Sequence, residues 1–334
     1  MKNISFIEGS IKKMPLVTFA LITYNQEKYI KSALDGALSQ TYSPLEILIS
    51  DDNSSDKTFE IIETEIKKYS GPHSITINRN KENLGLIGHV NKIFELAKGE
   101  LIIAAAGDDI SMPHRTMVLM KHYFSEIEKP LLMHSKAIEI DLNGNQTGNI
   151  SPDKILRKNK TLLAAAKSSA LYLGATGLWS KDLYKKYGLL RYKNSYEDLT
   201  LGFRAHLEGR IKYIDEALIY YRYGNGISTS SNTLNNFRDY IKHRNLVLQR
   251  RIENCQQRLD DFSTSHNNNF EIKNNLIRII KLNKIRQSLL NFPRLIPLLI
   301  FKNPITFFTS ALLETKVLFT TAANIFLRNS RNKL

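Results

Sequence analysis

Cysteine, tryptophan and long uncharged apolar runs are scarce in this chain of 334 residues. The single cysteine, Cys255, excludes an intrachain disulfide framework and a cysteine-rich zinc site, which fits a reducing compartment. The N-terminal stretch MKNISFIEGSIKKMP has no apolar segment typical of a secretory signal, so we expect a cytoplasmic protein. The longest uncharged stretches near the C-terminus, 303–313 and 317–327, are too short to span a bilayer.

Acidic residues are scarce in the last third of the chain. Residues 1–233 hold 30 Lys and Arg against 26 Asp and Glu, a net charge of +4, whereas residues 234–334 hold 17 against 6, a net charge of +11. This basic excess is interleaved with apolar segments, which favours a helical region 233–334 that lies on an anionic membrane surface. We therefore expect a peripheral location on the inner face of the cytoplasmic membrane.

Two alternatives remain for this basic region. It could pack on the rest of the chain, or join two copies in a homodimer. A nucleic-acid-binding protein is a rival interpretation of the charge, but no nucleic-acid-binding motif or row of exposed aromatic residues accompanies the basic residues. We therefore expect no nucleic-acid partner.

The segment GELIIAAAGDDISMPHR contains the most informative pattern in the chain. Its apolar run, 101–106, is bounded by glycines and is typical of a buried strand in a parallel sheet. Asp108 and Asp109 follow at the carboxyl end of that strand, where open α/β sheets bind ligands. Two carboxylates there would repel a phosphorylated ligand unless Mg²⁺ or Mn²⁺ lay between them. Alternatively, one of them caps the helix that Pro113 opens.

The same order of strand, polar turn and helix occurs earlier in the chain. The apolar run 16–22 leads into Thr23, Tyr24 and Asn25, and the run 45–49 ends in Asp51 and Asp52. Strands that alternate with helices predict βαβ units and a parallel sheet. Because the carboxyl ends of its strands share one edge, Asp52 should lie near Asp108 and Asp109.

Four motifs in this order and spacing, ITYNQEKYIKSALDGALSQTY, ILISDDNSSDKT, NLG and GDDISMP, resemble the nucleotide-sugar domain of family 2 inverting glycosyltransferases. The resemblance covers roughly residues 15 to 230 and implies an α/β GT-A fold, a Rossmann-like, mostly parallel sheet flanked by helices. It divides the chain into an N-terminal extension (1–14), a GT-A domain (15–232) and a C-terminal helical appendage (233–334). Within the domain we expect a nucleotide-binding half (15–129) and an acceptor half (130–232).

The resemblance also implies the residues of a donor site. Asp52 would accept a hydrogen bond from N3–H of the base, which uracil and thymine carry and cytosine lacks, so UDP- or dTDP-sugars are the expected donors. Asp108 would approach the ribose or the metal, and Asp109 would bind Mn²⁺ or Mg²⁺ on the diphosphate. Ala106 stands where many relatives have a further Asp. The remaining nucleotide contacts would come from Thr23, Tyr24, Asn25 and Gly85, whereas Asp51 is expected to support the turn.

In the acceptor half, the motif that begins Glu197-Asp198 resembles the motif whose Asp is the catalytic base of the family. Asp198 would be that base and Glu197 would orient the acceptor or the loop, although both could simply cap a helix. Trp179 could stack on a sugar, but a lone Trp in an apolar run is more often a core residue. Arg222 could reach the diphosphate, and Gly224 stands near the position of a His in the family.

The segment that follows Arg222, up to Ser231, is rich in Gly, Ser and Thr. It could order over a bound donor or be an ordinary surface loop. The resemblance implies a metal-dependent hexosyltransferase that moves a sugar to a hydroxyl of a glycan acceptor. A lipid-linked acceptor in O-antigen or capsule synthesis would explain the basic, apolar C-terminal region. The alternative is a catalytically silent relative that only binds nucleotide sugars.

Overall fold

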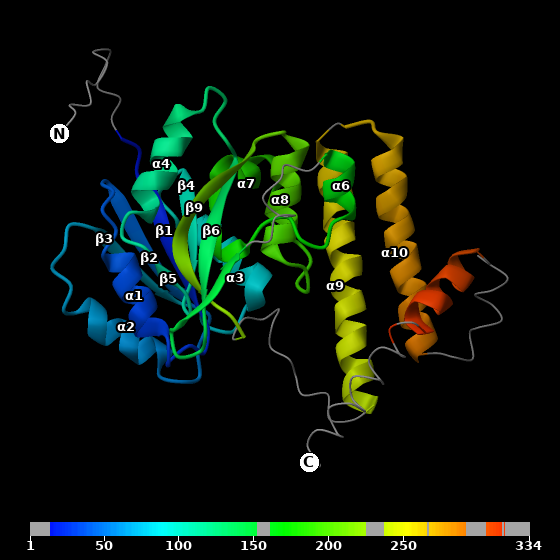
Figure 1. The fold of residues 1–334 in the computed structure, drawn as a ribbon, viewed down its shortest axis with the longest axis horizontal. Helices are drawn as coiled ribbons and strands as arrows, with labels where there is room; N and C mark the ends of the chain where they lie inside the picture. The colour runs from blue at the N-terminus through cyan, green and yellow to red at the C-terminus, as the bar shows by residue number, and fades with distance from the viewer. Residues whose placement is uncertain are drawn as a thin grey trace.

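The computed structural model describes residues 14–151, 161–224, 237–265, 267–291, 305–315 and 317. These residues form a mixed, mostly parallel sheet of nine strands with helices on both faces, followed by a pair of long C-terminal helices (Figure 1). The sheet order is β3-β2-β1-β4-β8-β6-β9-β5, with β7 paired to β6. This is the α/β architecture that the sequence predicted.

The first half of the sheet is parallel and places the polar turns at one edge. Thr23 at the end of β1 lies opposite Asp51 of β2, and Ile22 lies opposite Ala106 of β4. The segments that follow these strands therefore meet at their carboxyl ends, as predicted. The elements are β1 (Val17–Thr23), α1 (Ile30–Leu38), β2 (Leu45–Asp51), α2 (Thr58–Ile66), β3 (Ser74–Arg79), α3 (Gly85–Leu96) and β4 (Leu101–Ala106).

A short strand, β5 (Ile110–Ser111), separates the two acids after β4 from the next helix, α4 (Arg115–Ser125). The residue before α4, His114, makes no side-chain capping hydrogen bond. Asp108 and Asp109 therefore do not cap this helix, and the capping alternative for them is wrong. The pairing of β5 with β9 holds the acid pair against the far half of the sheet.

The second half of the sheet is joined to the first by β8, which is antiparallel to both β4 and β6. Strand β9 (Ile211–Arg222) is irregular: Ile214 pairs with Ser135 and Ala217 with Lys136, so the register shifts at the two residues between them. The elements are β6 (Leu132–Ile140), β7 (Gln146–Ser151), α6 (Leu162–Lys167), η1 (Gly174–Thr176), β8 (Leu178–Ser180), α7 (Lys181–Tyr187), α8 (Glu197–Leu207) and β9 (Ile211–Arg222).

The sheet has a hydrophobic core on each face, because successive side chains of a strand point to opposite sides. In β1, Phe19 and Leu21 belong to the core that α1 covers, whereas Ala20 belongs to the core that α3 and α8 cover. In β4, Ile103 belongs to the core that α1 covers, and Ile102 belongs to the core that α3 and α8 cover. Burial on both faces explains why these strands appear in the sequence as continuous apolar runs.

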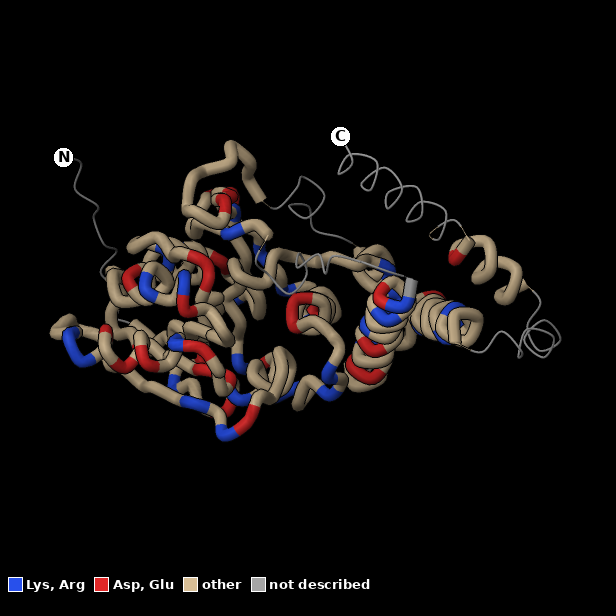
Figure 2. The backbone as a smooth tube through the Cα atoms, turned by 90° about the horizontal axis from the view of Figure 1, so that it is seen from below, with Lys and Arg blue, Asp and Glu red and all other residues tan. Residues whose placement is uncertain are grey.

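The C-terminal helices α9 (Phe237–Thr264) and α10 (Phe270–Asn291) run antiparallel beside α8 (Figure 1). A bidentate ion pair joins α8 to α9: Arg204 donates to Asp261 at 2.9 and 3.1 Å, and both side chains are almost completely buried. Figure 2 shows the charged segments of α9 and α10 at the side of the molecule that faces away from the parallel strands.

A further helical segment, 305–315, packs on this pair through a buried charge cluster. Glu314 accepts hydrogen bonds from Arg244 of α9 and Arg286 of α10. Ser310, which is fully buried, donates to the carbonyl of Leu282. Part of the basic region thus packs against the chain itself. No helix among the described residues is both long enough and apolar enough to cross a bilayer.

Candidate active site

A cavity of about 750 Å³ lies at the edge of the sheet where β1, β2 and β4 end. A cavity of this size accommodates a small-molecule ligand. Every site residue that the sequence predicted lines it, including five acids from three distant segments. The convergence of these acids is therefore confirmed. The predicted residues in its wall are Thr23, Tyr24, Asn25, Asp52, Gly85, Asp108, Asp109, Trp179, Glu197, Asp198 and Arg222.

Asp52 directly follows β2 and is almost completely buried. Its Oδ1 accepts hydrogen bonds from Asn80 Nδ2 (2.8 Å) and from the backbone N–H of Leu84 (2.9 Å), and its Oδ2 accepts one from the N–H of Gly85 (2.9 Å). A carboxylate oxygen has two lone pairs, so one acceptor position remains on Oδ2. Gly85 has a φ of +69°, a conformation that favours glycine. The result is a carboxylate of fixed orientation in the cavity wall.

The neighbouring Asp51 supports the turn, as expected. Its carboxylate accepts from the backbone N–H and the hydroxyl of Ser54 and from the hydroxyl of Thr23. Ser54 Oγ in turn accepts from the N–H of Asn25, whose φ is +51°. These bonds link the turn after β1 to the turn after β2, so both present fixed backbone groups to the cavity.

Asp108 and Asp109 are held by the end of β9. The backbone N–H of Arg222 donates to Asp109 Oδ1 at 2.8 Å, and Arg222 Nε donates to the carbonyl of Asp108 at 2.9 Å. The same guanidinium donates to the carbonyl of Asp141 and lies 4.4 Å from the ring centre of Tyr29. Arg222 thus stabilises the loop of the acid pair, a role that the sequence did not suggest.

Burial, and then the charge of Asp108, raise the pKa of Asp109 well above its ordinary value. The Arg222 N–H and the charges of Arg115 and Arg222 oppose this effect. Two buried carboxylates side by side carry a negative charge that a bound cation would offset. The local electrostatics therefore fit a divalent cation.

The protein supplies few ligands for such a cation. Among the described residues, no three His, Cys, Asp or Glu side chains come together as a metal site. Mg²⁺ is commonly held by one or two carboxylates together with substrate phosphates and water. Asp109 with its neighbour fits that kind of open site, in which a diphosphate completes the coordination.

Two buried residues near this edge were missed by the sequence analysis. Arg115, the first residue of α4, is fully buried and donates to Ser111 Oγ and to the carbonyls of Ala104 and Ala175. These hydrogen bonds join β4 to the η1 turn. His89 of α3 contacts Ser50 Oγ through Nε2 at 2.8 Å, and burial lowers its pKa below the ordinary value.

On the opposite wall, Glu197 and Asp198 form the first turn of α8. Burial raises the pKa of Glu197 above its ordinary value, and the adjacent charge of Asp198 raises it further. Burial also raises the pKa of Asp198, against the N–H of Leu199 and the charge of Arg258. Asp198 Oδ1 is buried without a hydrogen-bond partner. A Cβ atom at Gly174 would lie 2.5 Å from Glu197 Oε1, so any side chain there would displace this carboxylate.

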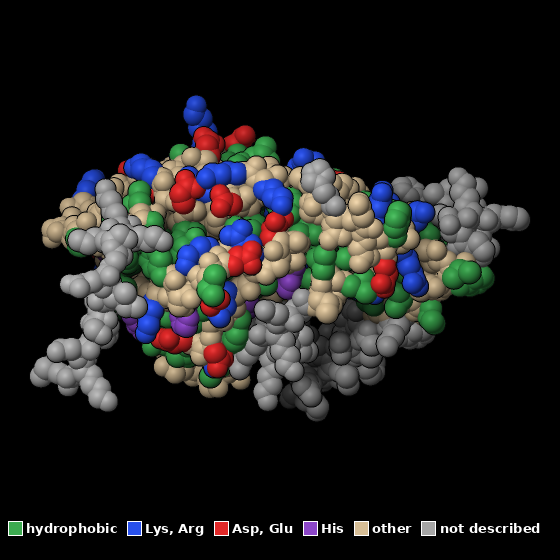
Figure 3. Space-filling view, turned by 90° about the horizontal axis from the view of Figure 1, so that it is seen from above, with side chains coloured by type: hydrophobic (Ala, Val, Ile, Leu, Met, Phe, Trp, Pro, Cys, Tyr) green, Lys and Arg blue, Asp and Glu red, His purple; other side chains and the backbone are tan. Residues whose placement is uncertain are grey.

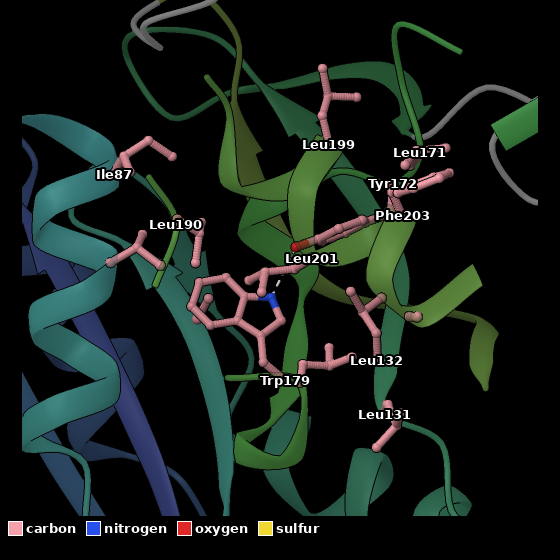
Figure 4. Packing of buried hydrophobic residues seen from close by; sticks show 14 of the residues in the cluster. Ile87, Leu131, Leu132, Leu171, Tyr172, Trp179, Leu190, Leu199, Leu201 and Phe203 are labelled. Atoms are coloured by element: carbon pink, nitrogen blue, oxygen red, sulfur yellow. Dashed lines mark hydrogen bonds between the residues drawn. The ribbon is translucent and has the colours of Figure 1, made fainter. Parts of the chain in front are cut away.

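Trp179 belongs to the hydrophobic core. Its indole N–H donates to Tyr172 Oη at 2.9 Å, and its ring stacks on Phe94 with 5.7 Å between ring centres (Figure 4). Only 1% of its surface is exposed. The core interpretation is therefore correct, and the alternative of a sugar-stacking platform is wrong because no ring face is exposed. The predicted loop over the donor, from Asn225 onward, lies outside the described residues.

The part of the chain that forms strands β1 to β4 matches a known protein family. Residues 18–127 match the model of glycosyl transferase family 2. This part of the chain, from β1 to α4, is therefore similar to glycosyl transferase family 2. An uncharacterized glycosyltransferase of Methanocaldococcus jannaschii is 33% identical to this chain over 142 residues, which are 42% of this chain and 48% of the relative. The chain thus matches about half the length of that relative.

Two solved structures share the fold of this chain. S. aureus TarS in complex with UDP-GlcNAc is 19% identical, with 92% of each chain covered and a TM-score of 0.54. The mannosyltransferase PcManGT from Pyrobaculum calidifontis, in complex with GDP-Man and Mn²⁺, is 15% identical, with 94% of this chain and 87% of that chain covered and a TM-score of 0.54. These likenesses show the GT-A fold.

Proposed function

We propose that this chain is a family 2 glycosyltransferase, which transfers a sugar, with inversion, from a UDP- or dTDP-sugar to a hydroxyl of a glycan acceptor. The observation that carries the proposal is the convergence of Asp52, Asp109 and Asp198 on one cavity. Asp52 and Asp109 come from the donor edge of the sheet, and Asp198 comes from a helix on the opposite wall. A nucleotide-sugar donor and a hydroxyl acceptor need such a two-sided site.

The remaining acceptor position of Asp52 supports the choice of base. Uracil and thymine present an N3–H donor to a carboxylate, whereas cytosine has an unprotonated nitrogen there. UDP- and dTDP-sugars are therefore the donors that this site favours. The TarS complex holds UDP-GlcNAc and the PcManGT complex holds GDP-Man, so the shared fold accommodates more than one base.

In the proposed reaction, Asp198 accepts the proton of the acceptor hydroxyl. The acceptor oxygen forms a bond to the anomeric carbon as the bond from that carbon to the diphosphate oxygen breaks on the opposite face, which inverts the centre. Asp109, together with Asp108, would hold Mn²⁺ or Mg²⁺, which neutralises charge on the departing diphosphate. Glu197 orients the acceptor beside Asp198. The turn of Thr23, Tyr24 and Asn25 contacts the nucleotide.

The acceptor is proposed to be lipid-linked, as in the synthesis of a cell-surface polysaccharide. The support comes from the outer face of segment 305–315, where Ile305, Phe308 and Leu312 are 82%, 62% and 73% exposed. Their spacing of three and four residues places them on one side of a helix. An exposed apolar stripe of this kind is typical of a helix that lies in a membrane interface.

Charge complementarity favours an anionic membrane over a second copy of this basic chain as the partner of that stripe. Most exposed charged residues of α10 are basic, and Figure 3 shows hydrophobic and basic side chains close together at the end of the molecule that α10 forms. Basic residues near a membrane surface contribute about 1 kcal/mol each with anionic lipid. The exposed basic residues of α10 are Lys273, Arg278, Lys281 and Lys284.

A donor screen tests the proposal. UDP-, dTDP-, GDP- and CMP-sugars are each added to the full chain with Mn²⁺, and the shift of Tm is measured, since a ligand that binds the native state raises Tm. We expect UDP- or dTDP-sugars to stabilise the chain and CMP-sugars not to. NMR of the slow hydrolysis product then reports the anomeric configuration, which should be inverted. Stabilisation by none of the donors, or a retained configuration, would contradict the proposal.

A further inference from the structure

The C-terminal helix α9 makes direct contacts with the segment that leads into the proposed catalytic turn. The backbone N–H groups of Arg191, Asn194 and Tyr196 donate to side chains of α9, at 2.8, 2.7 and 3.2 Å. The acceptors are Gln257, Glu253 and Asn254. The position of Glu197 and Asp198 therefore depends on a helix that lies beyond the family match.

Arg258 of α9 contacts the segment that leads into the cavity wall. It is almost completely buried, and its NH1 group donates to the carbonyls of Ala166 and Ser168 at 3.0 and 2.8 Å. Its guanidinium carbon lies 5.6 Å from the ring centre of Phe203 on α8. The two residues that follow Ser168, namely Ser169 and Ala170, line the cavity. Arg258 therefore fixes a part of the acceptor wall from behind.

Part of this guanidinium and one carboxylate oxygen of the neighbouring helix α8 make no hydrogen bond to the described residues. Within the part of the chain that the structure describes, Arg258 Nε and NH2 and Asp198 Oδ1 are buried without hydrogen-bond partners. Unpaired buried charges are costly, so two opposite ones in one region stabilise each other. The charge of Arg258 lowers the pKa of Asp198 against the larger, raising effect of burial.

We propose that Arg258 is a positioning residue of the active site, which holds the wall at residues 166–170 and places a buried positive charge on the α9 side of Asp198. The inference rests on the proposed function, because it assigns Asp198 the role of base. It makes α9 a part of the catalytic machinery rather than an appendage that only tethers the domain. A base must be deprotonated before it accepts the acceptor proton, and a facing cation favours that form.

Several other groups face Asp198 and act in the opposite direction. Among the described residues, these are Glu197 and Tyr196 of its own segment and Tyr172 of the cavity wall. The charge of Glu197 disfavours a second negative charge beside it. Arg258 is the cation that counters burial and this like charge. Its loss should therefore raise the pKa of Asp198.

Carbon-13 NMR of the full chain labelled at Asp carboxyl carbons tests the inference without donor or acceptor. The Asp198 signal is assigned by its loss in Asp198→Asn and is titrated in the wild type, Arg258→Gln, Arg258→Lys and, as control, the exposed Arg251→Gln. We expect the pKa of Asp198 to rise by about one unit or more in Arg258→Gln and to change little in Arg258→Lys and Arg251→Gln. An unchanged pKa in a folded Arg258→Gln chain would overturn the inference.

A second measurement leaves Arg258 in place, in case its replacement prevents folding. The nitrogen-15 signal of Arg258 Nε, assigned by its absence in Arg258→Lys or by through-bond experiments, is followed with pH in the wild type and in Asp198→Asn. We expect a step with the midpoint of the Asp198 titration in the wild type and none in Asp198→Asn. A signal without that step would overturn the inference. Because neither experiment needs sugar transfer, failure here is distinguishable from failure of the proposed function.

Discussion

The backbone N–H of Arg222 donates a 2.8 Å hydrogen bond to Oδ1 of Asp109, although the two residues lie 113 positions apart in the sequence. This bond joins the last residue of β9 to the acid pair after β4. It fixes one oxygen of Asp109 and thereby the direction of the other. The end of β9 thus determines the geometry of the predicted metal ligand that follows β4.

Replacing Asp109 tests the predicted role of this carboxylate in metal binding. Asp109→Asn keeps the size of the side chain but removes the charge, so Mn²⁺-dependent binding of UDP should weaken by roughly tenfold or more. Calorimetry with and without Mn²⁺ measures the effect. In Asp51→Asn, the matched control in the supporting turn, the metal dependence should persist. Equal Mn²⁺ dependence in Asp109→Asn and the wild type would exclude Asp109 as a ligand.

The raised pKa of Glu197 predicts a pH-dependent cost in stability. A carboxyl whose pKa is higher in the folded than in the unfolded chain binds more protons when folded, so stability falls as pH rises from the unfolded pKa through the folded one. Each unit of the difference corresponds to about 1.4 kcal/mol. Because burial and Asp198 raise this pKa, Glu197→Gln should stabilise the chain at pH 8 and have little effect at pH 4. Urea unfolding at both pH values measures this difference, and equal effects would contradict the assignment.

The buried ion pair between Arg204 and Asp261 should dominate the attachment of α9 to α8. Asp261→Asn leaves the Arg204 charge buried and unpaired, which costs about 3–5 kcal/mol in comparable pairs. The adjacent Asp260 provides a matched control, because its contacts to Arg191 and Tyr192 lie near the surface. Asp260→Asn should cost less than about 1 kcal/mol. Urea unfolding of both variants measures the loss of unfolding free energy. Equal losses in the two variants would disprove this ranking.

The exposed stripe on 305–315 predicts binding to anionic vesicles. The double replacement Phe308→Ser, Leu312→Ser removes two large apolar side chains, each worth roughly 1.5–3 kcal/mol on burial. Flotation with vesicles of phosphatidylglycerol and phosphatidylcholine should show at least a tenfold loss of binding. Ile127→Ser, at a fully exposed residue after α4, serves as control and should bind normally. Wild-type chain that does not float with these vesicles would refute the membrane proposal.

The donor edge was predictable because its signals are local in the sequence. Strands buried on both faces appear as apolar runs, and the acids at their ends, such as Asp52 and Asp108, follow directly. The parallel pairing of these strands then brings the acids together without any further information. The capping interpretation of Asp108 and Asp109 was wrong because a two-residue strand, β5, is too short to be recognised from periodicity.

The support of the site was not predictable, since its contacts join distant segments. Arg115 and Arg258 have the sequence appearance of ordinary solvated basic residues, yet both are buried and donate to backbone carbonyls. Their partners lie in other elements of the fold, so no spacing rule reveals them. His89 is weakly indicated by the sequence, because it lies among the apolar residues of α3. A polar side chain that is buried there needs a hydrogen-bond partner.

The central claim is that Asp198 is the base of an inverting sugar transfer, and the most direct test compares Asp198→Asn with the wild type. With the donor found by the screen, transfer to the acceptor, or to water in its absence, is measured beside donor affinity. We expect the transfer rate of Asp198→Asn to fall by roughly 10²- to 10⁴-fold while donor affinity stays near the wild-type value. Transfer at the wild-type rate, or a parallel loss of transfer and donor binding in a folded chain, would contradict the claim.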